Sequence, residues 1–219
     1  MKPALESDYK LLIFDWDGTL SDSVSRISKC IQLAASDHHL PVPSYQQASN
    51  IIGLGLIEAV RYLFPDADEQ LVSEVSRSYS AHYRSLESGP PDFFPYVLPL
   101  LTEFKANNYL LAVATGKSRA GLNRALRATG LEVTFDSSRC ADETESKPCP
   151  LMLEQLLEEF QLQPEQALMV GDTEYDMEMA AQIAMPRLAV SYGAHSAERL
   201  KQYQPIACID CFSKIINLI

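Results

Sequence analysis

Long apolar runs and positive charge are both scarce in this sequence. No stretch approaches the roughly 20 consecutive apolar residues that a membrane-spanning helix needs. Residues 1–10 are polar and lack the apolar segment of a signal peptide. Lysines and arginines together number 18 against 29 aspartates and glutamates, a net charge of −11, so the chain lacks the basic surface that binds nucleic acid or anionic membranes. We therefore expect a cytoplasmic protein that binds neither nucleic acid nor membrane.

Cysteine is too sparse and too scattered to form a disulfide framework. The five cysteines are odd in number, which favours reduced thiols. Cys208 and Cys211 form a Cys-x-x-Cys pair beside a predicted terminal strand, but no matching second pair accompanies them. A single pair is a weak zinc signal, and packing is the favoured interpretation of both side chains.

The chain does contain enough apolar residues for a substantial core. Its 219 residues are 47% hydrophobic, which suits one large domain or a core with an insert. Residues 11–14 are four consecutive apolar residues followed by Asp15, Asp17 and Gly18, a pattern typical of a strand buried on both faces of a parallel sheet. Open α/β sheets gather their ligand-binding groups at the carboxyl ends of strands. Asp15 and Asp17 are therefore candidates for chemistry as well as for turn formation.

Residues 22–92 contain helical patterns that no strand pattern interrupts. Ser21 or Asp22 is the expected N-cap of the first helix, and later apolar faces end at Pro65 and near residues 89–91. We predict a helical cap domain over residues 22–92. Its two connections to the core, near Ser21 and near residues 88–91, contain small and turn-forming residues that suit a hinge.

From residue 93 onward, helices alternate with strands. We expect helices at 97–104, 120–126, 151–160, 177–183 and 212–219, and strands at 110–114, 167–170 and 188–190. The short segment between residues 115 and 147 has room for one helix and one strand. This alternation predicts an α/β fold, a doubly wound parallel sheet, with a core formed by residues 1–21 and 93–219.

Three later stretches place polar residues at predicted strand ends or loops. Thr115 opens Thr-Gly-Lys-Ser, which is not a P-loop because position 111 is leucine where a P-loop needs glycine. Lys147 precedes the helix at 151–160, Asp172 follows the strand at 167–170, and Asp176 lies four residues later. Taken singly, Thr115 and Asp172 could be helix N-caps and Lys147 a solvated surface side chain.

Together these four motifs resemble, in order and position, those of the haloacid dehalogenase superfamily. The helical insert between the first two resembles the phosphoglycolate phosphatase-like branch. The resemblance implies a catalytic set of Asp15 as nucleophile, forming an aspartyl-phosphate, Asp17 as general acid and base, and Thr115 and Lys147. It also implies that phosphate is bound by Asp15, Thr115, Lys147 and main-chain N–H groups near Trp16, Asp17 and Gly116.

The same resemblance implies a Mg²⁺ site. Its ligands would be the carboxylates of Asp15 and Asp172 and the main-chain carbonyl of Asp17, with Asp176 just outside the direct ligands. In the cap, a short loop resembles the one that contacts substrate in this branch, and its apolar residues suit exclusion of water; it comprises Gly53, Leu54, Gly55 and Leu56. Arg61 could meet a second substrate anion, although a solvated helix position is the favoured interpretation.

The predicted function is Mg²⁺-dependent hydrolysis of a small-molecule phosphate monoester by a monomer or homodimer. A β-phosphoglucomutase-like sugar phosphomutase would share every catalytic residue and stays open as an alternative. A phospho-acceptor signalling domain is more distant, because its acceptor aspartate belongs on a later strand than its acidic pair. A dehalogenase is disfavoured, because dehalogenases lack an acid at the position of Asp17.

Overall fold

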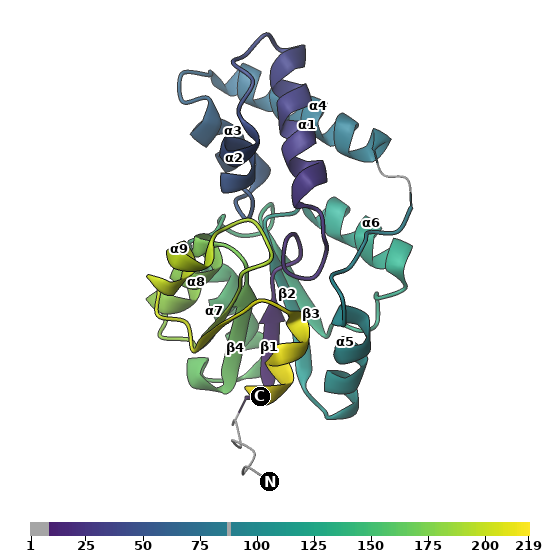
Figure 1. Cartoon of the computed structure of the whole chain (residues 1–219), viewed down its shortest axis with the longest axis vertical. Coiled ribbons are helices and arrows are strands. Elements are labelled where there is room, and N and C mark those ends of the chain that lie inside the picture. Colours follow the sequence, from purple (N-terminus) through teal and green to yellow (C-terminus); the bar gives the residue numbers. More distant parts are fainter. Residues whose placement is uncertain (1–8, 87–88) are drawn as a thin grey trace.

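A six-stranded parallel sheet forms the centre of the computed structural model, which describes residues 9–86 and 89–219. The strands lie in the order β3-β2-β1-β4-β5-β6 (Figure 1). Their bounds are β1 (Leu11–Phe14), β2 (Leu110–Thr115), β3 (Ser137–Cys140), β4 (Ala167–Gly171), β5 (Arg187–Val190) and β6 (Ala207–Ile209). The predicted fold class is confirmed, and β1 lies in the middle of the sheet.

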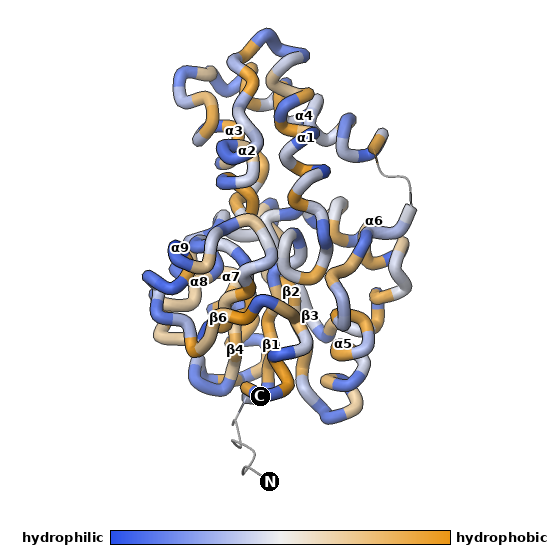
Figure 2. The backbone as a smooth tube through the Cα atoms, viewed as in Figure 1, coloured by the Kyte–Doolittle hydropathy of each residue, from blue (hydrophilic) through white to orange (hydrophobic). Residues whose placement is uncertain are grey.

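The burial of β1 explains its run of apolar residues. All four of its side chains are fully buried, because the strand pairs with β2 on one side and β4 on the other and is covered on both faces. Leu12 and Phe14 face one apolar cluster, whereas Leu11 and Ile13 face the other. Figure 2 shows the hydrophobic strands at the centre of the core.

Helices cover both faces of the sheet. One face packs against α5 (Val97–Ala106), α6 (Arg119–Thr129) and the 3₁₀ helix η2 (Phe212–Asn217). The other packs against α7 (Leu151–Phe160), α8 (Glu174–Gln182) and α9 (Ala197–Lys201). A short 3₁₀ turn, η1 (Pro164–Gln166), leads into β4.

Four helices stand beyond the carboxyl ends of the strands, at the top of Figure 1. They are α1 (Val24–Asp37), α2 (Tyr45–Asn50), α3 (Leu56–Leu63) and α4 (Glu69–Ser85); we call these helices and their loops, residues 24–85, the cap. The cap has its own apolar cluster, which includes Val60 of α3, Phe64 at the end of that helix, and Val72 and Val75 of α4. The domain boundaries at residues 22 and 92 stay a prediction. Ser88, in the predicted hinge, lies outside the described residues, as do residues 1–8 of the predicted core.

Several element boundaries differ from the prediction. The N-cap of α1 is Ser23, not Ser21 or Asp22, and its side chain makes no capping bond, because its hydroxyl donates to Asp17 instead (2.6 Å). The predicted helix at 177–183 begins earlier, at Glu174, where Thr173 and Asp176 form a capping box. The expected C-terminal helix is a 3₁₀ helix that ends at Asn217. The six-residue helix α2 and the five-residue helix α9 were not predicted.

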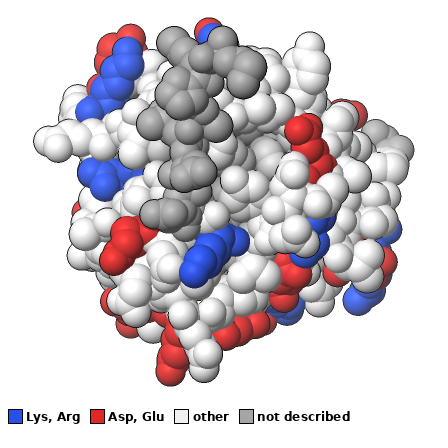
Figure 3. Space-filling model, turned by 90° about the horizontal axis from the view of Figure 1, so that it is seen from below, with Lys and Arg blue, Asp and Glu red and all other residues white. Residues whose placement is uncertain are grey.

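The face opposite the cap carries charges of both signs. In Figure 3 the lysine and arginine side chains alternate there with aspartates and glutamates among uncharged atoms. Within residues 9–86 and 89–219, no helix combines the length and the apolar character that crossing a membrane requires.

Candidate active site

Asp15 and Lys147 meet at the carboxyl end of β1. Asp15 directly follows the strand, and its main-chain N–H donates to Val170 of β4 (3.0 Å). Its carboxylate lies 2.8 Å from the Lys147 ammonium, which also lies 2.6 Å from Asp176. Lys147 is 1% exposed, so it is not the solvated surface lysine that its local sequence also allowed. The ammonium is instead enclosed between two carboxylates.

A third buried carboxylate, that of Asp172, lies close to these two acids. Asp15, Asp172 and Asp176 each offer an oxygen within 4.8 Å of the others. Asp172 accepts hydrogen bonds from the Thr19 hydroxyl and the Ala194 main-chain N–H, both at 2.7 Å. Burial raises the pKa of Asp172 well above its ordinary value, and the neighbouring carboxylates of Asp15 and Asp176 raise it further. The cluster therefore holds more negative charge than Lys147 alone can balance.

The geometry of this cluster suits a divalent cation. Asp15 Oδ2 is buried and has no hydrogen-bond partner among the described residues, and hard cations such as Mg²⁺ prefer carboxylate oxygen ligands. Both oxygens of Asp176 are already engaged, one by Lys147 and the other by the Thr173 main-chain N–H and hydroxyl. Asp176 is therefore placed to orient Lys147. Asp15 Oδ2 is available for a metal, and each oxygen of Asp172 accepts one hydrogen bond, which leaves it a second lone pair.

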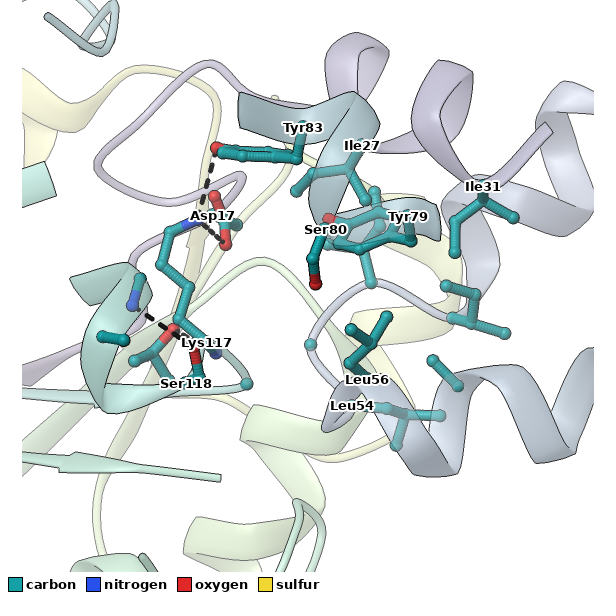
Figure 4. Close-up of a pocket in the computed structure, with 18 of the residues that line it drawn as sticks. Asp17, Ile27, Ile31, Leu54, Leu56, Tyr79, Ser80, Tyr83, Lys117 and Ser118 are labelled. Carbon is teal, nitrogen blue, oxygen red and sulfur yellow. Dashed lines mark hydrogen bonds and ion pairs between the residues drawn. The ribbon is translucent and has the colours of Figure 1, made fainter. Parts of the chain in front are cut away.

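Asp17 occupies a different environment from Asp15. Its carboxylate lies 2.9 Å from the Lys117 ammonium and accepts a hydrogen bond from Ser23 (2.6 Å). Lys117 also reaches the Tyr83 hydroxyl (3.3 Å) and lies 4.8 Å from the centre of that ring. Burial alone would lower the pKa of Lys117, but the Asp17 carboxylate and the Tyr83 hydroxyl together outweigh burial and raise the pKa. Asp17 is thus oriented by Ser23, the N-cap of α1, and by Lys117 from the loop after β2, whose contacts with Asp17 and Tyr83 are drawn in Figure 4.

The loop after β2 brings Thr115 and Gly116 to the same site. Thr115 is 1% exposed, and its hydroxyl accepts a hydrogen bond from the Lys117 main-chain N–H (3.2 Å). Gly116 allows close contact with the cap, because a Cβ atom there would lie 2.4 Å from the main-chain oxygen of Leu54. A larger residue at position 116 would push the cap loop away from the core.

The predicted cap loop lies against the core at several points. The Gly55 main-chain N–H donates to the Ser146 hydroxyl (2.8 Å), beside Lys147. Gly53, Leu54 and Leu56 line a cavity of about 190 Å³ that Asp15, Asp17, Thr115 and Lys117 also line. The structure therefore brings the cap loop and the two acids of the first motif to one enclosed space.

Other residues singled out in the sequence lie elsewhere or have different contacts. Arg61 makes a surface ion pair with Glu69 (2.7 Å) and does not line the cavity. The Trp16 side chain is fully buried against the rings of Phe93 and Phe135. Cys208 and Cys211 are free, half-buried cysteines.

Lys117, Ser23 and Tyr83 are site residues that sequence reasoning did not select. Lys117 carried one usable signal, its position two residues after Thr115 at a strand end. Ser23 resembled an ordinary helix-capping serine. Tyr83 resembled a buried residue on the apolar face of an amphipathic helix, because helical spacing does not reveal which end of α4 lies next to the active site.

The chain combines a parallel α/β core, clustered acids and a lysine at the carboxyl edge of the sheet, and a helical cap above that edge. This combination defines a class of hydrolases. Residues 12–190 match the family model for haloacid dehalogenase-like hydrolases, and the chain belongs to this family. It is 35% identical to "Probable phosphatase IndB" of Dickeya dadantii over 94% of this chain and 92% of that one. It is 30% identical to a phosphoglycolate phosphatase of Aliivibrio fischeri over 97% of each chain.

A similar solved structure points to the same family as these sequence relatives. A Haemophilus somnus protein described as a predicted phosphoglycolate phosphatase superposes with a TM-score of 0.84 and 26% identity, over 97% of this chain and 99% of that one. The resemblance noted in the sequence is therefore confirmed, and the chain is a phosphatase enzyme of this family, similar to phosphoglycolate phosphatases.

Proposed function

We propose that this protein is a Mg²⁺-dependent phosphatase that hydrolyses a small-molecule phosphate monoester through an aspartyl-phosphate on Asp15. One observation carries the proposal: oxygens of the buried carboxylates of Asp15, Asp172 and Asp176 lie within 4.8 Å of one another. Asp15 and Asp176 share the ammonium of Lys147, and Asp15 Oδ2 has no hydrogen-bond partner among the described residues. That free oxygen suits a nucleophile, a metal ligand, or both in turn.

The proposed metal ligands are the carboxylates of Asp15 and Asp172 and the main-chain carbonyl of Asp17. When bound there, Mg²⁺ would supply the positive charge that allows a phosphate dianion to approach a carboxylate nucleophile. Lys147 supplies a second positive charge beside Asp15. Asp176 and Thr173 hold Lys147 in place, because Asp176 bonds to both groups.

The proposed reaction has two steps at phosphorus. In the first, Asp15 attacks and the ester oxygen departs with a proton from Asp17; in the second, Asp17 removes a proton from water, which attacks the aspartyl-phosphate. Thr115, Lys147 and main-chain N–H groups near Trp16, Asp17 and Gly116 hold the phosphoryl oxygens. Lys117 and Ser23 orient the Asp17 carboxyl group.

The proposal is tested by measuring phosphate release from a panel of phosphate monoesters, with Mg²⁺ and with excess chelator. We expect activity only with the metal, and we expect Asp15→Asn to abolish turnover of every ester, because no other group can form the covalent intermediate. Acid quenching during turnover should trap phosphate on the wild-type chain but not on the variant.

Asp210→Asn is a matched control, because Asp210 is a surface carboxylate whose ion pair, within the described part of the chain, is with Lys214. It should retain wild-type activity. Full turnover in metal-free enzyme, or by Asp15→Asn, would contradict the mechanism. Conversion of a sugar phosphate to its isomer, dependent on a bisphosphate activator, would instead identify a phosphomutase.

A further inference from the structure

The cavity beside the candidate active site extends from the core into the cap. Its core end contains Asp15, Asp17, Thr115 and Lys117, the groups proposed to hold and transfer the phosphoryl group. Asp17, the proposed proton donor to the ester oxygen, lies on the cap side of this set, next to Tyr83 of α4 and Ser23 at the start of α1. The alcohol part of the ester would therefore extend past Asp17 into the cap.

The cap end of the cavity is lined by apolar side chains from three helices and the cap loop. In Figure 4 these residues face Asp17 and Lys117 across the open space. Ile27 and Ile31 of α1 and Ile52 of the loop are at most 6% exposed, so their surfaces are held in place by packing. The wall consists mainly of Ile27, Ile31, Ile52, Leu54, Leu56 and Tyr79.

The positively charged residues that line this space are distinct from those of the apolar wall. Among the described residues that line the cavity, the cations are Lys117, Arg84 and Arg124. Lys117 is already paired with Asp17 at 2.9 Å. Arg84 is exposed at the end of α4, and Arg124 is half-buried on α6. A carboxylate held against the isoleucine and leucine side chains of the apolar wall would find no hydrogen-bond donor in them, and burying a carboxylate without a partner is unfavourable.

The size of the cavity also limits the alcohol. An apolar cavity of about 150 Å³ is large enough to bind benzene, and this one is about 190 Å³. Because the phosphoryl group would occupy the core end of this volume, the remaining space best suits a compact alcohol, such as one ring or a short branched chain.

We propose that the substrate is a phosphate monoester of a compact apolar alcohol, with a branched aliphatic or single-ring group and no second anion beside the ester. The inference rests on the proposed phosphatase function and adds the substrate class. It sets this chain apart from enzymes that select phosphoglycolate, in which the alcohol carries a carboxylate.

The test compares two esters of the same shape, 2-phosphoglycolate and isobutyl phosphate, which differ by replacement of the carboxylate with an isopropyl group. We expect kcat/KM to be at least about tenfold higher for isobutyl phosphate, since one methylene in an apolar pocket is worth roughly 10–200-fold. The kcat/KM for benzyl phosphate should also exceed that for methyl phosphate. Equal or better turnover of 2-phosphoglycolate would overturn the inference.

Two variants on the same helix test whether the cavity wall is the source of this substrate preference. Leu56 and Leu63 are both half-buried leucines of α3, but only Leu56 lines the cavity. Leu56→Ala should lower the ratio of kcat/KM for benzyl phosphate over methyl phosphate by about tenfold, whereas Leu63→Ala should leave that ratio at the wild-type value. Equal changes in both variants would mean that the cap responds to lost packing and that the cavity does not select the alcohol.

Binding of non-hydrolysable phosphonates separates this inference from the proposed reaction. Calorimetry with Mg²⁺ should show tighter binding of 3-methylbutylphosphonate than of 3-phosphonopropionate, and Leu56→Ala should reduce that difference. If no ester is hydrolysed but this binding preference is present, the proposed phosphatase reaction is wrong and the proposed recognition of an apolar alcohol is supported. If esters are hydrolysed but 3-phosphonopropionate binds more tightly, the apolar recognition is wrong and the phosphatase stands.

Discussion

Two carboxylates only two residues apart, Asp15 and Asp17, have opposite surroundings. Asp15 lies in the core beside Lys147 and two further acids, whereas Asp17 faces the cap and is bound by Lys117 and Ser23. The turn at Gly18 contributes to this separation: its φ is +85°, and a Cβ atom there would lie 2.2 Å from Asp172. The two acids can therefore serve as nucleophile and as proton carrier without competing for the same partner.

Replacing Asp17 with asparagine should affect alkyl and aryl esters differently. The main-chain carbonyl of residue 17 is retained, so phosphoryl transfer should fall by roughly 10²–10⁴-fold for an alkyl ester that needs a general acid. An aryl ester with a stable leaving group should lose much less in this step, and phosphoenzyme should accumulate because water lacks its base. Single-turnover rates with both ester types measure the difference. Equal losses would show that Asp17 is a structural or metal-site residue.

Lys117 should matter only through Asp17. Lys117→Met removes the ammonium that fixes the Asp17 carboxylate, and misplacement of a catalytic group by about 1 Å costs on the order of 10²-fold. In an Asp17→Asn background the same change should cost far less, because coupled residues are not additive. A double-mutant cycle in kcat/KM for an alkyl ester measures this coupling, with Lys105→Met, at the surface pair with Asp136, as control. Additive losses would refute the positioning role.

At the scale of elements, the end of α2 is joined to the core by several polar contacts. The Asn50 main-chain oxygen accepts from the Tyr175 hydroxyl (3.0 Å) and lies 3.1 Å from His195 Nε2. The Asn50 side chain bonds to Arg199, which also pairs with Glu174. Because these contacts connect α2 with α8 and α9, they hold the cap loop that follows α2 against the active site.

His195 should make this junction sensitive to pH. Its Nδ1 accepts from the Glu174 main-chain N–H (3.0 Å), so the neutral ring carries its proton on Nε2 and donates to Asn50. Burial lowers the pKa of His195, and the Arg199 guanidinium lowers it further. The folded state therefore binds fewer protons than the unfolded state below the ordinary histidine pKa of about 6.5. The contribution of neutral His195 to the free energy of unfolding is fully present above that pH and is lost as the pH falls below it.

We expect the wild-type protein to lose more stability than His195→Gln between pH 7.5 and pH 5.5, because glutamine keeps a donor and an acceptor but does not titrate in this range. Urea unfolding midpoints of both proteins across this range measure the effect. Parallel pH dependence of the two proteins would rule out His195 as the source.

At the scale of the whole molecule, two layers from distant parts of the sequence close around one site. The core supplies the charged groups at the carboxyl edge of the sheet, and the cap supplies apolar surface (Figure 1). Without a bound metal the acid cluster destabilises the folded state, because Asp172 is buried and because Asp15, Asp172 and Asp176 repel one another. Metal binding should therefore stabilise the entire fold.

Mg²⁺ at about a hundred times its Kd should add roughly 2.7 kcal/mol of stability, which corresponds to a Tm rise of about 5–10 °C for a chain of this size. Asp172→Asn should abolish most of this rise while leaving the metal-free Tm unchanged or higher, because it removes both a ligand and a repulsive charge. Scanning calorimetry with and without Mg²⁺ measures both effects, and Asp210→Asn should respond like the wild type. An undiminished rise in Asp172→Asn would exclude Asp172 as a ligand.

The sequence by itself determined the sheet, the alternation of helices and strands, and the order of the polar motifs. These features follow from local patterns: the apolar run at Leu11, Leu12, Ile13 and Phe14, followed by a turn signal, favours a strand buried on both faces. The carboxyl ends of parallel strands necessarily share one edge, so Asp15, Thr115 and Asp172 could be expected together before any coordinates were known.

Only the tertiary structure decided which partner each of these groups has. Ser23 reads as a helix cap from its neighbours, but packing of the cap turns its hydroxyl toward Asp17. Lys117 and Tyr83 are 34 residues apart in the sequence, and they form a hydrogen bond because the end of α4 packs against the loop after β2. Local patterns fix which face of an element is apolar, whereas the contacts between its polar ends depend on how the cap and the core are placed against each other, which no short segment of sequence encodes.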